Sequence, residues 1–244
     1  GQQKKQPMLM PVVTGLLDSN GNDLPLQLQG QGDSPETSQI LHFHGEQENF
    51  TFSNITEKPV LSVLRNFSAP VKVEMVRSDE DLAFLMAHDS DSFNRWDAGQ
   101  QLSLKYILQQ IDICQQGGSL VVPDIFLDSF RKLLTDRKAD PAFVALAVSL
   151  PMENWIGQQL EVIDPDAIFS VLQFFRLQLS KQLQSEFMDI YPAFLNDALG
   201  MFFTGFGKPK GKLYKDILRS LTKRRPLFKA VGDLVAFGRA VIGI

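Results

Sequence analysis

The stretch Pro70-Val-Lys-Val-Glu-Met-Val-Arg-Ser-Asp-Glu-Asp-Leu-Ala-Phe-Leu-Met86 decides the fold, because its periodicity changes from one half to the other. Up to Arg77, apolar and charged residues alternate, which is the pattern of a strand with one buried face. After Asp81 the apolar residues recur at helical spacing, and Ser78, three positions before Asp81, is a favourable helix N-cap. We therefore expect strands before about residue 77 and helices after about residue 79.

The region before this boundary has the signals of a small β-domain. Short apolar segments are separated by Gly, Asn, Asp and Pro, and no helical periodicity lies between them. Asn20-Gly21 directly follows the first apolar run and favours a tight reversal of the chain. Several short strands with such turns are typical of a sandwich. The expected strands are 8–17, 24–28, 39–44, 48–54, 59–65 and 70–76, with Phe50, Phe52, Val71 and Val73 among the buried side chains.

The region after the boundary shows helical spacing interrupted by prolines and by Gly117-Gly118. Short links between consecutive helices favour an α-helical array. The expected helices are 79–88, 92–115, 124–136, 140–149, 152–160 and 165–190, with Leu82, Leu85, Trp96, Leu104 and Leu108 buried. The fold class is therefore α+β, with a β-sandwich domain over 1–77 and an α-helical domain over 78–204.

Charge sets the last 40 residues apart from the rest. The chain has 244 residues and a net charge of −4, but residues 1–204 carry 14 basic and 26 acidic residues. Residues 205–244 carry ten basic and two acidic residues, followed by an amphipathic end. A basic tail of this kind attracts nucleic acid or an anionic membrane. A binding module that works through the tail is therefore one function to consider, although no aromatic stacking motif accompanies the charge.

Composition places the chain among globular proteins of a reducing compartment. It contains one cysteine, Cys114, so no internal disulfide can form. No run of 18 apolar residues occurs, and the first residues lack the apolar core of a signal peptide. We expect a cytoplasmic protein without a membrane span.

The sequence lacks the residue patterns of a catalytic centre. A His-Glu-x-x-His zinc motif is absent, since the three histidines are His42, His44 and His88 and none has that spacing. His42 and His44 share one strand face, but two ligands alone are typical of solvent-facing histidines. Phosphate-binding glycine loops and a Gly-x-Ser-x-Gly elbow are also missing. The prediction is that this chain has no catalytic, cofactor-binding or metal-binding residues of its own.

Two further groups have an ordinary explanation. Asp89-Ser90-Asp91 begins like a calcium loop, but Phe93 stands at the next ligand position, so we expect a helix-capping or solvated acidic cluster. Cys114 lies in an apolar helical run, which favours a buried and unreactive thiol.

Several segments, in one order, resemble aminopeptidase N enzymes of bacteria, which are zinc metallopeptidases. Pro59-Val-Leu-Ser-Val-Leu-Arg-Asn-Phe-Ser-Ala-Pro-Val71 is similar to the last strands of their β-sandwich. His88-Asp-Ser-Asp-Ser-Phe-Asn-Arg-Trp-Asp-Ala-Gly-Gln100 is similar to the start of their C-terminal helical domain. Later landmarks are Asp140-Pro141-Ala142, Ser149-Leu150-Pro151 and Ile163-Asp-Pro-Asp-Ala-Ile168. The resemblance covers roughly residues 8–195.

The resemblance implies a role without chemistry of its own. Family members combine an N-terminal β-domain, a zinc catalytic domain, an immunoglobulin-like sandwich and a helical superhelix. Their zinc ligands and their Gly-Ala-Met-Glu-Asn substrate strand lie upstream of the region matched here. This chain would thus scaffold and cap a catalytic domain that acts on peptides, which would be its partner, and the zinc would belong to that domain.

Two features depart from the family. Met152-Glu153-Asn154 repeats part of the substrate motif, but Leu150-Pro151 precede it, so we interpret it as coincidence. After about Leu195 the family pattern stops and the basic tail begins. A truncated or frame-shifted reading frame, or a junction with an added segment, would explain this change.

Overall fold

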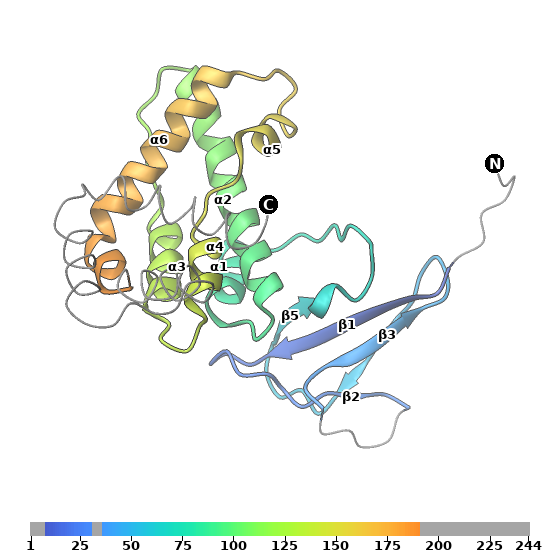
Figure 1. Cartoon of the computed structure of the whole chain (residues 1–244). Coiled ribbons are helices and arrows are strands. Elements are labelled where there is room, and N and C mark those ends of the chain that lie inside the picture. Colours follow the sequence, from blue (N-terminus) through green and yellow to red (C-terminus); the bar gives the residue numbers. More distant parts are fainter. Residues whose placement is uncertain (1–7, 31–35, 191–244) are drawn as a thin grey trace, which may run out of the picture. The chain divides into compact units, whose positions relative to one another are not determined.

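The computed structural model describes residues 8–30 and 36–190, and these form two compact units. The first unit comprises residues 1–98 and the second residues 99–244, so the division falls inside a helix, α2 (Ser92–Gln115). Strands precede helices along the chain, as Figure 1 shows by its colours. The predicted α+β fold class is confirmed, whereas the domain limits at 77 and 204 stay a prediction.

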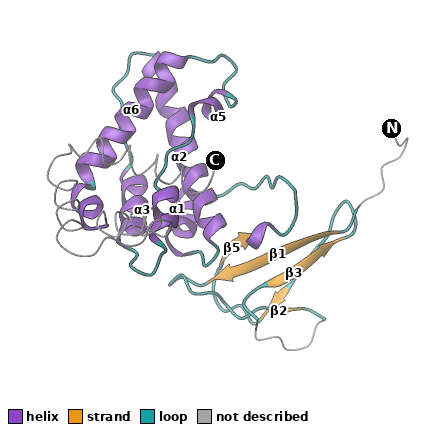
Figure 2. Cartoon of the chain, viewed as in Figure 1, coloured by secondary structure: helices purple, strands orange, loops and turns teal. Residues whose placement is uncertain are grey.

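The β-part of the first unit consists of two small sheets (Figure 2). In the larger sheet, the central strand β1 pairs antiparallel with β3 on one side and with β5 on the other. In the smaller sheet, β2 pairs with β4. The bounds are β1 (Met10–Leu17), β2 (Gln27–Leu28), β3 (Gln39–Phe43), β4 (Phe52–Ser53) and β5 (Val60–Val63).

The chain reverses after β1 as Asn20-Gly21 predicts. Gly21 has a φ of 85°, a left-handed conformation that glycine adopts at no steric cost, and its N–H donates to the Asp18 carbonyl at 3.1 Å. A single bridge between Leu17 and Asp23 then closes the reversal. The returning segment does not extend the pairing with β1, because β3 and β5 already occupy both of its edges.

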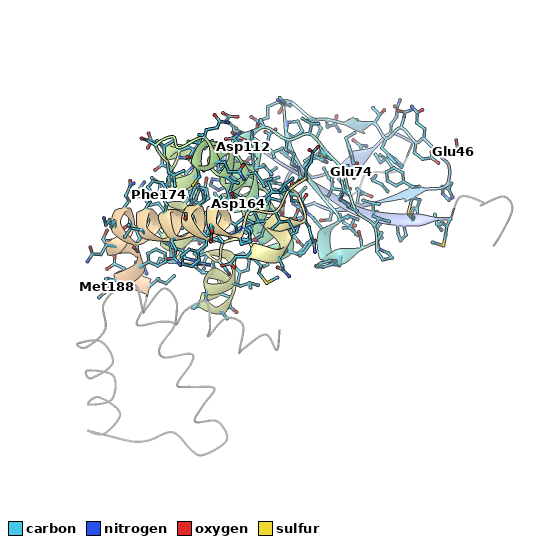
Figure 3. All side chains as sticks on the ribbon, turned by 90° about the horizontal axis from the view of Figure 1, so that it is seen from above. Glu46, Glu74, Asp112, Asp164, Phe174 and Met188 are labelled. Atoms are coloured by element: carbon cyan, nitrogen blue, oxygen red, sulfur yellow. The ribbon has the colours of Figure 1, made fainter. Side chains whose placement is uncertain are left out.

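The predicted strand at 70–76 is wrong. Among the described residues this segment has no strand partner, and the Val71 N–H donates only locally, to the Ala69 carbonyl at 2.9 Å. Val73 is 42% exposed, and Glu74, labelled in Figure 3, forms a surface ion pair with Lys72. Alternating apolar and polar residues are compatible with a strand. A strand forms only where the backbone of a neighbouring segment supplies hydrogen-bond partners.

The helices begin close to their predicted positions, because the residues that cap them are close to the helix start in the sequence. The Ser78 hydroxyl accepts from the Asp81 N–H at 3.0 Å, and α1 starts at Asp79. Asp140 and Asp164 cap α4 and α6 in the same way, each followed by a proline at the first helical position. The remaining bounds are α1 (Asp79–His88), α3 (Asp124–Thr135), α4 (Pro141–Ala147), α5 (Glu153–Gly157) and α6 (Pro165–Gln182).

The second unit is an array of helices around an aromatic core. Phe126 of α3 lies at its centre, with ring centroids 4.6 Å from Phe130 and 5.3 Å from Phe175 of α6. Glutamines of α2 fasten the links between helices: Gln100 donates to the Ser149 carbonyl at 2.7 Å. Gln115 likewise donates at 3.1 Å to Asp164, which Figure 3 labels.

The face that α2 buries is rotated from the predicted one. Leu82 and Leu85 of α1 are buried as expected, but Trp96, Leu104 and Leu108 are only partly buried. In the second unit α2 buries Leu102, Tyr106, Ile107 and Ile111 instead. Both sets have helical spacing, so the pattern alone did not determine which stripe faces the core. Phe50 and Phe52 are likewise partly buried.

Candidate functional site

In the part of the chain that the structure describes, the histidines belong to no group of three potential metal ligands. His42 lies in β3 and His44 directly after it, both are exposed, and their ring centroids are 6.2 Å apart. Among residues 8–30 and 36–190, no three His, Cys, Asp or Glu side chains are grouped so as to hold a metal ion. A zinc site of the resembled family needs three side-chain ligands. The described part of this chain does not bring three such ligands together.

A buried polar cluster is the most organised chemical feature of the first unit. We call it the Arg65 cluster, and it combines residues from the β-part with residues that follow α1. Its members are Asp23, Ser38, Ser62, Arg65, Asp89, Ser90, Asp91 and Asn94. Sequence reasoning missed Arg65, whose signal was a single charge inside the apolar run from Leu61 to Phe67.

The Arg65 side chain is 4% exposed, and each of its three nitrogens donates a hydrogen bond. Nε donates to the Ser62 hydroxyl at 2.8 Å, and Nη1 donates to the Ser38 hydroxyl at 3.2 Å. Nη2 forms ion pairs with Asp23 at 2.6 Å and with Asp89 at 3.4 Å. A buried guanidinium is tolerated only with such compensation, so these four groups fix its position.

Asp89 carries the least compensated charge of the cluster. Its Oδ1 accepts from the Asp91 N–H at 2.9 Å, but Oδ2 is buried without a hydrogen-bond partner of normal geometry. Burial raises the pKa of Asp89, and the Ser62 hydroxyl, the Asp91 amide and the Arg65 charge oppose that shift only in part. The expectation of a solvated acidic cluster is therefore wrong for Asp89, because it is the buried counter-ion of Arg65.

Asp91 fulfils the expected capping role. Its Oδ1 accepts from the Asn94 N–H at 2.9 Å at the start of α2, and its Oδ2 accepts from the Asn66 N–H at 2.9 Å. The Asn94 amide in turn donates to the Ser62 hydroxyl at 2.8 Å. These contacts tie the turn after β5 to the start of α2 within one unit.

The backbone beside Arg65 is left-handed at non-glycine residues. Leu64 has φ 60°, Asn66 φ 55° and Phe67 φ 52°, values that L-residues other than Asn and Asp rarely adopt. They belong to the short 3₁₀ helix η1 (Arg65–Phe67) and its N-cap. Strained backbone persists where the surrounding contacts stabilise it. Here the hydrogen bonds of the Arg65 side chain supply such contacts. The result is that Arg65 points inward while Phe67 is 66% exposed.

The Arg65 cluster has the properties of a group that stabilises the fold. Each of the three Arg65 side-chain nitrogens donates to a serine hydroxyl or a carboxylate of the cluster. Cys114 is partly buried on α2, where a buried position was expected. Met152-Glu153-Asn154 lies at the start of the short helix α5, with Met152 at its N-cap. The basic tail, 205–244, lies outside the described residues.

Three domain-family models match stretches of this chain. A domain of unknown function described as DUF3458 with an Ig-like fold matches residues 1–76. Its companion DUF3458_C, described as ARM repeats, matches residues 79–201. The ETF-QO/FixC family C-terminal domain matches residues 179–242. The matches define an Ig-like domain followed by an ARM-type helical array.

Three curated relatives of the chain are named aminopeptidase N. The chain is 38% identical over 192 residues to aminopeptidase N of Escherichia coli, covering 79% of this chain and 22% of that protein. It is 29% identical over 190 residues to aminopeptidase N of Haemophilus influenzae, covering 78% of this chain and 21% of that protein. The chain belongs to the DUF3458_C family and is homologous to the non-catalytic region of aminopeptidase N.

A solved structure agrees in fold. Legionella pneumophila aminopeptidase A, in complex with aspartic acid, superposes with a TM-score of 0.61 at 23% identity, over 94% of this chain and 24% of that one. The chain thus spans about a fifth of the length of the curated relatives above. None of the matches supports the alternative of a binding module.

Proposed function

We propose that this chain is the non-catalytic portion of a zinc aminopeptidase that removes N-terminal residues from peptides. In this role it scaffolds and caps the catalytic domain, which is its partner, and peptide substrates meet it only through that domain. The observation that carries the proposal is the homology to aminopeptidase N over 192 residues. A cytoplasmic location, suggested by the single cysteine, is part of the same proposal.

The residues of the chain fit a supporting role. In the Arg65 cluster the charge of Arg65 is paired with Asp23 and Asp89. The cluster also holds the turn after β5 against the start of α2. When bound in the catalytic domain, zinc would supply an activated water, and its ligands would come from that domain. The described residues here would contribute stability and shape.

A chimera tests the proposal. In aminopeptidase N of Escherichia coli, the 192 matched residues are replaced by their counterparts from this chain. If the chain is a competent scaffold, the chimera should hydrolyse an aminoacyl-arylamide in a zinc-dependent way. Its kcat/KM should lie within about tenfold of the parent enzyme, since a tenfold change corresponds to about 1.4 kcal/mol.

Two variants control the chimera. Arg65→Ala should abolish activity by disrupting the scaffold, whereas Lys181→Ala removes an exposed charge of α6 and should leave activity intact. A chimera that folds cooperatively but hydrolyses nothing would contradict the proposed function.

A further inference from the structure

An aromatic stack stands on the surface of the first unit. The ring centroids of Phe67 and Phe93 are 3.8 Å apart at an interplanar angle of 45°, and those of Phe93 and Trp96 are 5.7 Å apart at 37°. Phe67 is 66% exposed, while Phe93 and Trp96, in the first turns of α2, are partly buried. We call these three residues the aromatic ridge.

The backbone holds the tip of the ridge outward at a cost. Phe67 and two of its neighbours, Leu64 and Asn66, are in the left-handed region, and the bonds of Arg65 maintain that turn. The turn leaves the Phe67 ring 66% exposed, away from the buried state that is favourable for a large apolar side chain. Strained backbone beside an exposed aromatic ring motivates the hypothesis that this ring contacts a surface outside this unit.

A second part of the unit is also open to an outside surface. The segment 70–76 keeps the alternation of a strand, yet Val73, Met75 and the fully exposed Val76 lack cover. No ladder within the described residues pairs with it. Scattered exposed apolar residues are common, but an aromatic stack together with an unpaired strand pattern is typical of a surface that is covered in an assembly.

The length of the relatives indicates what covers it. The matched region accounts for 22% of the Escherichia coli enzyme and 24% of the Legionella structure, so most of each relative lies outside it. We propose that the aromatic ridge is the docking surface by which this chain seats on the remaining, catalytic portion of an aminopeptidase N polypeptide. This inference rests on the proposed function and names the surface that serves it. Aromatic side chains at the centre of a contact carry most of its energy.

The test compares Phe67→Ser in the chimera and in the 244-residue chain. In the chimera the substitution should shorten the half-life of activity at an inactivating temperature by about tenfold, because a central aromatic contact is lost. In the isolated chain it should lower the urea midpoint only slightly, since the ring is already 66% exposed and loses only its contact with Phe93. Phe169→Ser, at a 55% exposed phenylalanine of α6 outside the ridge, is the matched control and should keep the half-life of the chimera.

The outcomes separate the two proposals. An unmodified chimera without activity overturns the proposed function and the docking inference together. An active chimera whose half-life is insensitive to Phe67→Ser overturns the docking inference alone, as does an equal loss in the Phe169→Ser control. A dimer of the isolated chain that dissociates on Phe67→Ser would assign the ridge to a second copy and would also overturn the inference.

Discussion

The guanidinium of Arg65 lies directly against the backbone of Gly15 in the middle of β1. A β-carbon placed on Gly15 would overlap Cζ, Nη1 and Nε of that side chain. Glycine is therefore required at this position by the close approach of a buried charge, and not by its φ angle. The contact places the central strand beside the guanidinium that bonds Asp23, Ser38, Ser62 and Asp89.

The first prediction concerns Gly15→Ala. The added methyl group must displace the Arg65 guanidinium from the position in which it donates to Ser62, Ser38, Asp23 and Asp89. We expect a loss of about 2–4 kcal/mol in the free energy of unfolding, measured by urea denaturation. Gly45→Ala is the matched control, because its nearest neighbour would be at an ordinary 3.6 Å, and it should be nearly neutral.

Arg65 itself gives a second prediction. Arg65→Met leaves Asp23 and Asp89 without their cation and should cost about 3–5 kcal/mol of unfolding free energy. Arg65→Lys keeps the charge but loses the three-sided donor geometry, so it should also destabilise the chain. Lys72→Met breaks an ion pair that is exposed on both sides and should change nothing measurable. Equal effects of Arg65→Met and Lys72→Met would contradict a buried role for Arg65.

The raised pKa of Asp89 predicts a pH dependence. Above the ordinary value of 3.8, the folded chain keeps the proton of Asp89 longer than the unfolded chain does. The stability linked to this proton is complete below about 3.8 and is lost as pH rises through the folded pKa. The free energy of unfolding of Asp89→Asn minus that of the natural chain should therefore increase over that window and then level off. Urea titrations from pH 4 to 8 measure it, and a decrease would show that the folded pKa is lowered.

Local signals in the sequence predicted much of the fold. Ser78, Asp140 and Asp164 set the helix starts, because a cap needs only residues within one turn. The segment 70–76 could not be assigned in the same way, since a strand depends on a partner that may be far along the chain. The alternation in 70–76 is that of a strand, but none of the described residues pairs with this segment.

The Arg65 cluster was beyond sequence reasoning for a related reason. Hydrogen-bonded partners in it are separated by up to 67 residues, as in the bond from Ser90 to Asp23 at 2.6 Å. Asp89-Ser90-Asp91 was recognisable as a polar group near a helix start, and Asp91 does cap α2. Nothing in the local pattern indicated that Asp89 would be buried opposite Arg65, because that requires the pairing of β1 and β5.

The central claim is that this chain supports peptidase chemistry without carrying it. The direct measurement is the hydrolysis of an aminoacyl-arylamide by the purified 244-residue chain, with and without added zinc, beside the chimera as a positive reference. The account predicts no hydrolysis by the chain in either condition and chelator-sensitive hydrolysis by the chimera. Chelator-sensitive release of an N-terminal residue by the chain alone would contradict it.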